Sequence, residues 1–158
     1  MKTIIVYRSR HGCAEKSARL LEEQMKGDIV VFNLKDKPKI DIEGADAVII
    51  GGSIHTGKIQ GTVKKFCRDN LALLLQKKLG LYICCMEEGE KAQEEFETAY
   101  PEDLRSHAFV TGIFGGEFDI EKMNFVERLI IKKVAKVTSS VSKFKKEAVS
   151  KFAQDFNA

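Results

Sequence analysis

Two short apolar segments of this chain each end in a loop of glycine and small polar residues, and this repeated arrangement is the strongest constraint on its fold. Residues 4–7 (Ile-Ile-Val-Tyr) lead into the loop 9–14, and residues 47–50 (Ala-Val-Ile-Ile) lead into the loop 51–57. When a helix follows such a loop, the unpaired N–H groups of its first turn point at any anion bound there. Two such loops above neighbouring parallel strands face one crevice, where open α/β sheets bind ligands. The pattern therefore predicts a mononucleotide site.

The composition is typical of a globular protein of one domain. The chain has 158 residues, of which 44% are hydrophobic and 31% are charged, and its formal net charge is +3. We expect residues 1–158 to form a single domain with a sizeable core. No apolar run approaches the ~20 residues of a membrane span, and residues 4–7 are too short for the apolar core of a signal peptide. We therefore expect a cytoplasmic protein.

The charges and the cysteines exclude several classes of function. The basic residues form no arginine-rich stripe and do not alternate with aromatic residues, so the mild positive charge does not indicate a nucleic-acid partner. The four cysteines, Cys13, Cys67, Cys84 and Cys85, show no Cys-x-x-Cys or Cys/His ligand spacing. We therefore expect no metal site and a reducing compartment, with Cys84 and Cys85 packed in the core.

Segments with the patterns of strands and helices alternate along the chain. Strands are predicted over residues 3–8, 29–33, 47–51, 79–85 and 108–112, and helices over residues 13–26, 61–75, 90–98, 122–137 and 143–157. Strands that alternate with helices are joined by right-handed crossovers, which build a doubly wound parallel sheet with helices on both faces. Residues 115–121 form a loop longer than the connection needs, and loops of this kind often carry function.

Three stretches carry a resemblance to a known family. They are Ser9-Arg10-His11-Gly12, residues 50–58 (Ile-Gly-Gly-Ser-Ile-His-Thr-Gly-Lys), and Gly115-Gly116-Glu117-Phe118 leading into residues 128–132. On these stretches the chain resembles flavodoxins, and it is most similar to the short flavodoxin-fold group that includes bacterial menaquinone-dependent protoporphyrinogen oxidase. Residues 50–58 are the most specific, because they contain one residue more than the corresponding loop of common electron-transfer flavodoxins, as in the oxidase-like group.

The resemblance implies a flavodoxin-like sheet of five parallel strands in the order 2-1-3-4-5, with FMN at the switch point between strands one and three, as is known for this fold. It places the FMN phosphate on residues 9–14 and the isoalloxazine ring between residues 53–58 and the loop 86–89. The candidate cofactor-binding residues are therefore Ser9, Arg10, His11, Gly12, Cys13, Ala14, Ser53, Ile54, His55, Thr56, Gly57, Met86, Glu87, Glu88 and Gly89.

The chain departs from the flavodoxin pattern at the phosphate and at the ring. Ala14 stands where the phosphate loop of the family usually closes on a threonine, so one hydroxyl contact is lost. The chain has no Trp, and neither loop beside the implied ring position carries Tyr or Phe. The ring is therefore expected to lie against Ile54, His55 and Met86 rather than against an aromatic side chain.

Three classes of function stay open at this point. The first is an electron-transfer protein that carries electrons between larger redox partner proteins. The second is an enzyme, a quinone-coupled flavin dehydrogenase of the protoporphyrinogen oxidase type. The third is a flavodoxin fold used as a binding module without flavin, for which Ala14 is the only indication. In the first two, the chemistry belongs to the flavin, and the protein sets its potential and access. The oligomeric state also stays open.

Lysines gather on the last two predicted helices. They are Lys132, Lys133, Lys136, Lys143, Lys145, Lys146 and Lys151. In one interpretation these side chains are solvated, and the two helices cover the sheet with their apolar faces. In the other they form a basic surface that makes peripheral contact with anionic membrane lipids.

Overall fold

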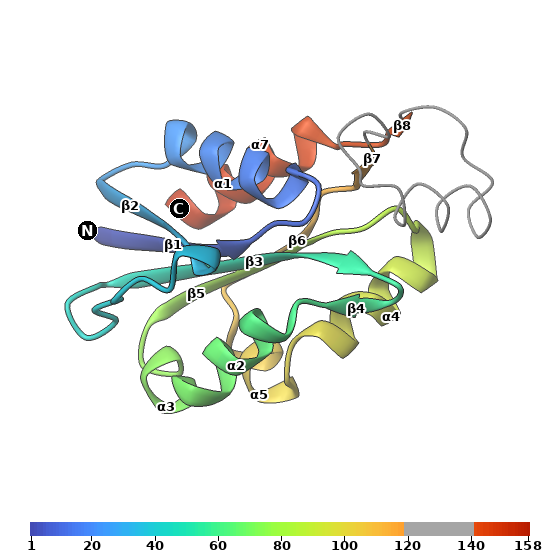
Figure 1. The fold of residues 1–158 in the computed structure, drawn as a ribbon. Helices are drawn as coiled ribbons and strands as arrows, with labels where there is room; N and C mark the ends of the chain where they lie inside the picture. The colour runs from blue at the N-terminus through green and yellow to red at the C-terminus, as the bar shows by residue number, and fades with distance from the viewer. Residues whose placement is uncertain (119–140) are drawn as a thin grey trace.

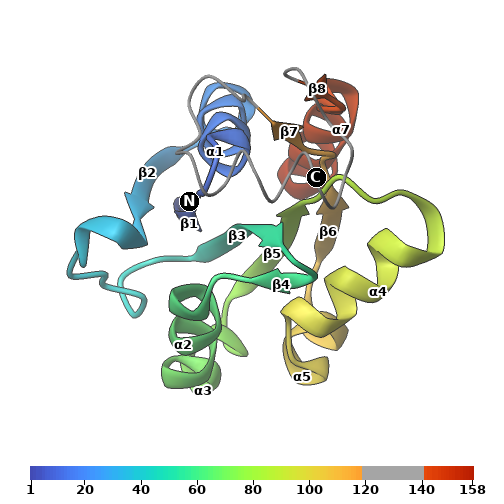
Figure 2. The ribbon, with the colours of Figure 1, turned by 45° about the vertical axis from the view of Figure 1, so that its right-hand side comes forward.

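The computed structural model describes residues 1–118 and 141–158, in which an open sheet carries helices on both faces (Figure 1, Figure 2). Five parallel strands of this part lie in the order β2-β1-β3-β5-β6. They are β1 (Lys2–Arg8), β2 (Asp28–Asn33), β3 (Ala47–His55), β5 (Lys78–Cys84) and β6 (Val110–Ile113). Counted among the parallel strands alone, this is the order 2-1-3-4-5, so the predicted fold class is confirmed.

The helices cover the two faces of the sheet in separate groups (Figure 1). On one face lie α1 (Cys13–Gln24) and α7 (Lys146–Asn157), and on the other α2 (Gly61–Asp69), α3 (Leu71–Leu74), α4 (Gly89–Ala99) and α5 (Glu102–His107). The shorter elements are the 3-10 helix η1 (Leu34–Asp36) and the antiparallel pair β7 (Glu117–Phe118) and β8 (Val141–Ser142). The predicted helix 122–137 lies outside the described residues.

The sequence of β3 explains why the sheet is covered on both faces. Val48, Ile49 and Ile50 are all fully buried, although successive side chains of a strand point to opposite faces. Ile49 packs in the apolar cluster beside α1 and α7, whereas Val48 and Ile50 pack in the cluster beside α2–α5. Ile5 of β1 pairs with both Val31 of β2 and Ile49. Continuous apolar strands of this kind are what a parallel sheet with two covered faces requires.

Residues 51–59 form a hairpin, which corrects the open loop predicted from their glycines. The strand β3 continues to His55 and pairs with β4 (Lys58–Ile59) running back beside it. The backbone of Thr56 (φ 49°) and Gly57 (φ 78°) is left-handed, as a two-residue turn of type I′ requires. Such turns are usually marked by Asn-Gly or Asp-Gly, and a β-branched Thr56 is an unusual occupant of the left-handed region. The sequence therefore gives no ordinary signal for this hairpin.

Two helix predictions also need correction, and one helix was not predicted. The predicted helix 61–75 is interrupted at Asn70, whose side-chain amide donates to the carbonyl oxygen of Phe66 at 2.9 Å and so competes with the helical backbone. The helix α5 is additional; its six residues are too few for an apolar period, although Glu102 and Asp103 suit a helix start. The last helix begins at Lys146 rather than at residue 143.

The lysines of the C-terminal region fall partly outside the described residues, because Lys132, Lys133 and Lys136 belong to the part that is not described. The others, Lys143, Lys145, Lys146 and Lys151, are exposed, and Lys151 pairs with Asp155 at 2.8 Å. Exposed lysines fit a solvated face and a lipid-facing surface equally well. Among the described helices, none has the length and apolar content needed to cross a bilayer.

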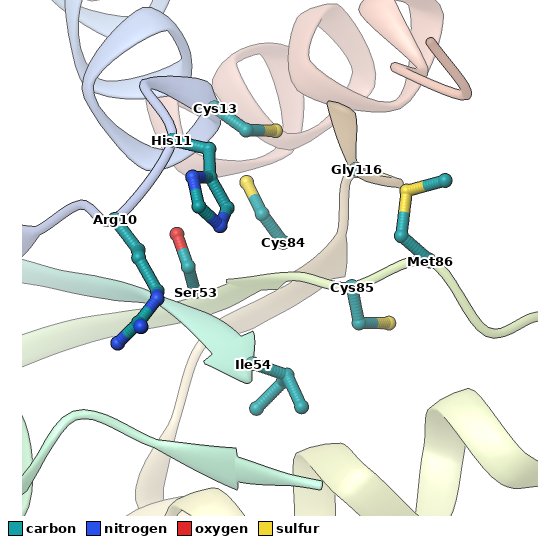
Figure 3. Close-up of a pocket in the computed structure, with 9 residues that line it drawn as sticks. All are labelled: Arg10, His11, Cys13, Ser53, Ile54, Cys84, Cys85, Met86 and Gly116. Carbon is teal, nitrogen blue, oxygen red and sulfur yellow. The ribbon is translucent and has the colours of Figure 1, made fainter. Parts of the chain in front are cut away.

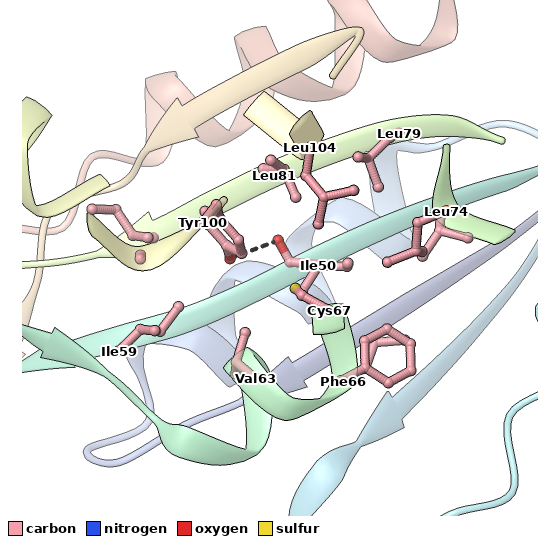
Figure 4. Packing of buried hydrophobic residues seen from close by; sticks show 14 of the residues in the cluster. Ile50, Ile59, Val63, Phe66, Cys67, Leu74, Leu79, Leu81, Tyr100 and Leu104 are labelled. Atoms are coloured by element: carbon pink, nitrogen blue, oxygen red, sulfur yellow. Dashed lines mark hydrogen bonds between the residues drawn. The ribbon is translucent and has the colours of Figure 1, made fainter. Parts of the chain in front are cut away.

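Tyr100 ties two central strands together on the α2–α5 face. Its ring is buried, and its hydroxyl lies 3.1 Å from the carbonyl oxygen of Ile50 (Figure 4) and 2.7 Å from the carbonyl oxygen of Tyr82. Burial raises the pKa of the Tyr100 hydroxyl well above its usual value, so this group stays a neutral donor. Because Ile50 belongs to β3 and Tyr82 to β5, one side chain bonds to both strands whose ends form the cleft described below.

Replacing Tyr100 by phenylalanine removes this hydroxyl and little volume. We expect Y100F to lower the free energy of unfolding by about 1 kcal/mol, the usual net contribution of one hydrogen bond. Urea unfolding followed by circular dichroism measures the change. An unchanged unfolding midpoint would show that the hydroxyl does not hold the two strands.

Candidate functional site

A cleft lies at the carboxyl ends of β1, β3 and β5, where the strand order of the sheet reverses (Figure 3). It is lined by Arg10, His11, Cys13, Ser53, Ile54, Cys84, Cys85, Met86 and Gly116. These residues come from the loop after β1, the end of β3, the end of β5 and the segment after β6. Its empty space, with the open mouth included, is about 320 Å³. This is the position at which open α/β sheets bind their ligands.

The loop after β1 shapes one wall of the cleft for an anion. Gly12 has a left-handed backbone (φ 95°), and no atom lies within 4 Å of the position that a Cβ would take. The Gly12 N–H donates to the hydroxyl oxygen of Ser9 at 3.0 Å. No described side chain caps α1, which starts at Cys13. The N–H groups of its first turn are therefore available to a phosphate in front of the glycine turn.

A buried hydroxyl in the cleft lacks a hydrogen-bond partner among the described residues. Ser53 is only 8% exposed, and its Oγ is enclosed by protein. Figure 3 shows this oxygen pointing into the space below His11 and Cys84. The Ser53 N–H is already bonded to Oε1 of Gln60 at 3.0 Å. Because a buried polar group without a partner costs ~1–3 kcal/mol, Ser53 is suited to a ligand that offers a polar group here.

The β3–β4 hairpin forms a second wall. Ile54 presents an apolar side chain to the cleft (Figure 3). The next residue, His55, has its ring 6.3 Å from the ring of His11, measured between centroids, with the ring planes at 66°. The two imidazoles thus come from loops far apart in the sequence and can donate hydrogen bonds to an anionic ligand.

Buried thiols form a third wall. The Cys13 thiol donates to the carbonyl oxygen of Gly115 at 3.7 Å, and Ser17 Oγ lies 3.5 Å from Sγ of Cys84. Burial raises the pKa of the Cys84 thiol well above its usual value, and burial raises the pKa of the Cys85 thiol to about 12. Since thiols that resist ionisation are poor nucleophiles, Cys84 and Cys85 contribute an apolar surface rather than reactive groups.

The structure brings residues from three predicted segments to one cleft. Arg10, His11, Cys13, Ser53, Ile54 and Met86 line it. Ser9 and Gly12 form the turn beside it, and His55, Thr56 and Gly57 form the end of the hairpin. The separate loops that the sequence singled out are therefore neighbours in space.

Apart from the five residues beside the cleft, four more predicted residues do not line it. Ala14 is fully buried in α1, where its carbonyl oxygen accepts a hydrogen bond from the Tyr82 hydroxyl at 2.9 Å. Glu87 and Glu88 are exposed on the loop after β5, and Gly89 is the first residue of α4. These two glutamates place negative charge near the cleft, but they do not line its interior.

Three lining residues were not among the predicted ones. The sequence predicts Cys84 and Cys85 as core residues because they lie in the apolar strand 79–85, and both are buried. They also lie at the carboxyl end of that strand, at the edge of the sheet where the cleft opens. Their place at a strand end was the signal in the sequence that could have assigned them to the site. Gly116 lies in the segment 115–121, which was predicted to be functional but was given no residue-level role.

Comparison with known proteins identifies the family. A family model described as a flavodoxin domain matches residues 4–144. The chain belongs to the flavodoxin domain family. Membership implies a flavin-binding redox protein with FMN as its cofactor. No curated protein matches the chain by sequence.

Solved flavodoxin structures share the fold of this family member. The WrbA-like flavodoxin of Agrobacterium tumefaciens has a TM-score of 0.62 and 14% identity over 99% of this chain and 95% of that one. Flavodoxin 1 of Bacillus cereus has a TM-score of 0.58 and 14% identity over 99% and 97%. Rubredoxin oxygen:oxidoreductase from Desulfovibrio gigas has a TM-score of 0.55 and 17% identity. The match covers 99% of this chain but only 37% of that protein. At these identities the likeness shows the fold alone.

The turn at Gly12 generates a test of the phosphate wall. A β-branched residue rarely adopts a positive φ, so G12V should distort the turn and close the approach to the N–H groups of α1. We expect a loss of FMN binding with little change in far-UV circular dichroism, because nothing in the sheet core touches this position. Fluorescence titration of the apoprotein with FMN measures the effect. A variant that purifies folded and fully yellow would contradict the assignment.

Proposed function

We propose that this protein carries electrons between redox partner proteins by means of a noncovalently bound FMN. Bound FMN supplies reversible transfer of one or two electrons. The observation that supports the proposal is the place of the cleft at the switch point of the sheet, with its mouth beside the exposed hairpin tip Thr56–Gly57 and the exposed Glu87 and Glu88. A ring bound there would have an edge within reach of a partner protein.

In this proposal the loop 9–14 holds the phosphate. The N–H groups at the start of α1 and the hydroxyl of Ser9 would bond to its oxygens, and the guanidinium of Arg10 and the imidazole of His11 would lie close by. Hydrogen bonds to a charged phosphate contribute roughly 1.5–3 kcal/mol each, so this wall would supply much of the affinity even though Ala14 offers no hydroxyl.

The apolar walls would enclose the rest of the flavin. Ile54 and Met86 would flank the ring, and the neutral thiols Cys84 and Cys85 would exclude water beneath it. The hydroxyl of Ser53, which lacks a partner among the described residues, would bond to a polar group of the ligand. These residues bind and orient; none of them is proposed to react.

A second candidate function is the quinone-coupled dehydrogenase of the protoporphyrinogen oxidase type. It is favoured by one observation: apart from His11, no ring-bearing side chain of the described residues lines the cleft, so one face of a bound ring would be open to a planar quinone. A membrane-dissolved quinone would also give the C-terminal lysines a role in peripheral contact with anionic lipids.

One experiment separates the two functions. Steady-state turnover of protoporphyrinogen with menadione as acceptor would establish the dehydrogenase. Rapid electron transfer from the reduced holoprotein to an acceptor protein, without turnover of protoporphyrinogen, would establish the carrier. A purified protein that binds no flavin would contradict both functions.

The charge of the hairpin predicts a raised reduction potential. Lys58 is exposed at the start of β4, directly after the turn Thr56–Gly57. A cation near the ring stabilises the negatively charged reduced flavin, and one unit charge at ~4 Å contributes about 1–4 kcal/mol before screening. A free energy of ~1.4 kcal/mol corresponds to ~59 mV for a one-electron couple. We therefore expect K58E to lower the reduction potential of the couple that forms the fully reduced flavin by tens of millivolts.

Spectroelectrochemistry of the wild type and of K58E measures this shift. K26E is the matched control, because it makes the same charge change at the other end of the sheet, between α1 and β2. The account of the hairpin is wrong if K58E leaves the potential unchanged or raises it, or if K26E lowers it equally.

A further inference from the structure

A partly buried carboxyl group lies behind the wall of the cleft. Glu95 sits on the inner side of α4, and its Oε1 is completely enclosed and has no hydrogen-bond partner among the described residues. The Glu95 carboxyl neighbours the Cys85 thiol, and Cys85 lines the cleft (Figure 3). One small side chain therefore separates Glu95 from the space in which a ring would lie.

The surroundings of Glu95 favour its protonated form. Burial raises the pKa of this carboxyl above its ordinary value, and the negative charge of Glu87 raises it further. Lys91, on the same helix, and a hydrogen bond from the neighbouring Cys85 thiol act in the opposite direction. The strand β4, which packs against α4, carries one charged residue, the exposed Lys58.

Within the part of the chain that the structure describes, few other ionisable groups face this carboxyl. The strand β6, which also packs against α4, has the sequence Val-Thr-Gly-Ile and no titratable side chain. Lys145 acts on the neighbouring Cys85, whose own pKa of about 12 keeps it neutral. Among the described residues on this side of the cleft, Glu95 is thus the carboxyl group that has a buried oxygen and a raised pKa.

We propose that Glu95 takes up one proton when the flavin bound in the cleft is reduced. The inference rests on the proposed binding of FMN and adds a residue that couples electrons to protons. Two electrons and one proton convert oxidised FMN into its anionic reduced form, and a second proton from solvent converts the Glu95 carboxylate into the carboxylic acid. The reductant is a chemical donor such as dithionite, and Glu95 itself is neither oxidised nor reduced.

The physical reason is the negative charge that reduction adds to a poorly solvated site. A negative charge near a partly buried carboxylate disfavours its ionised form, and solvent screens this repulsion less than it does for a fully exposed carboxylate. Glu87, Glu88, Glu90 and Glu94 also lie on this side, but all four are exposed to solvent. Their repulsion by the reduced ring is screened, so the proton goes to Glu95.

The first test is the pH dependence of the two-electron potential in the holoprotein. Uptake of one extra proton per two electrons steepens the slope by about 30 mV per pH unit, which is a tenfold change in the equilibrium constant per pH unit. We expect this steeper segment in the wild type, beginning above the ordinary Glu pKa of ~4.3, and its loss in E95Q. E94Q is the matched control, because it removes the same charge one residue away on the exposed side of α4.

Two outcomes of the first test would overturn the proposal. A steep segment that persists in E95Q would assign the proton to another group, with His11 and His55 as the candidates across the cleft. If the steep segment disappears equally in E94Q, the steep slope comes from the net charge of α4 and not from a proton taken up by Glu95.

The second test needs no flavin and separates this inference from the proposed function. In the folded protein the pKa of Glu95 is raised, so the native state binds more protons than the unfolded state between the two pKa values. Stability of the apoprotein should therefore fall as pH rises through this window, and E95Q should lose that fall while E94Q keeps it. Equal pH profiles for wild type and E95Q would overturn the role of Glu95. Failure of FMN to bind would contradict the proposed function, and with it the coupling, whatever the profiles show.

Discussion

The left-handed turn at Gly12 is the constraint on which the candidate site depends. The strand β1 ends at Arg8, and α1 begins at Cys13, so the chain must reverse over the edge of the sheet within a few residues. The reversal holds only if the helix is fixed beneath it. Tyr82 of β5 supplies one bond, from its buried hydroxyl to the carbonyl oxygen of Ala14, and the buried face of α1 supplies the rest. Core packing thus aims the first N–H groups of α1 into the cleft.

Charge is distributed unevenly around this cleft, and the flavin potential is expected to follow from the balance. The hairpin side ends in the exposed Lys58, and the loop after β5 carries the exposed Glu87 and Glu88. Between the two rims, neutral thiols and aliphatic groups line the part of the cleft away from Arg10 and His11. Solvent screens the exposed rims more than the partly buried carboxyl of Glu95, so we expect this carboxyl to respond to the charge of the ring more strongly than Glu87 and Glu88 do.

Much of the fold could be predicted because the parallel strands are apolar on both faces. Residues 47–50 contain no polar interruption, and the structure buries all of them. The positions that escaped prediction are those where local chemistry runs against the usual signals. Thr56 occupies a left-handed turn position that the sequence would assign to Asn or Gly, and Asn70 interrupts a helix whose apolar period continues past it. In the site, the sequence shows the glycine loops directly. It predicts Cys85 as a core residue, because a strand end beside a cleft has the same apolar composition as a strand end in the interior.

The most direct test of the account is a comparison of FMN with riboflavin. The two ligands share the ring and the ribityl chain and differ in the phosphate that the loop 9–14 is proposed to hold. Loss of charge-assisted hydrogen bonds worth roughly 1.5–3 kcal/mol each should weaken binding of riboflavin to the apoprotein by two or more decades. Fluorescence titration of one apoprotein preparation with both flavins gives the two dissociation constants. A hundredfold or greater preference for FMN is the predicted result, and equal dissociation constants would contradict the central claim.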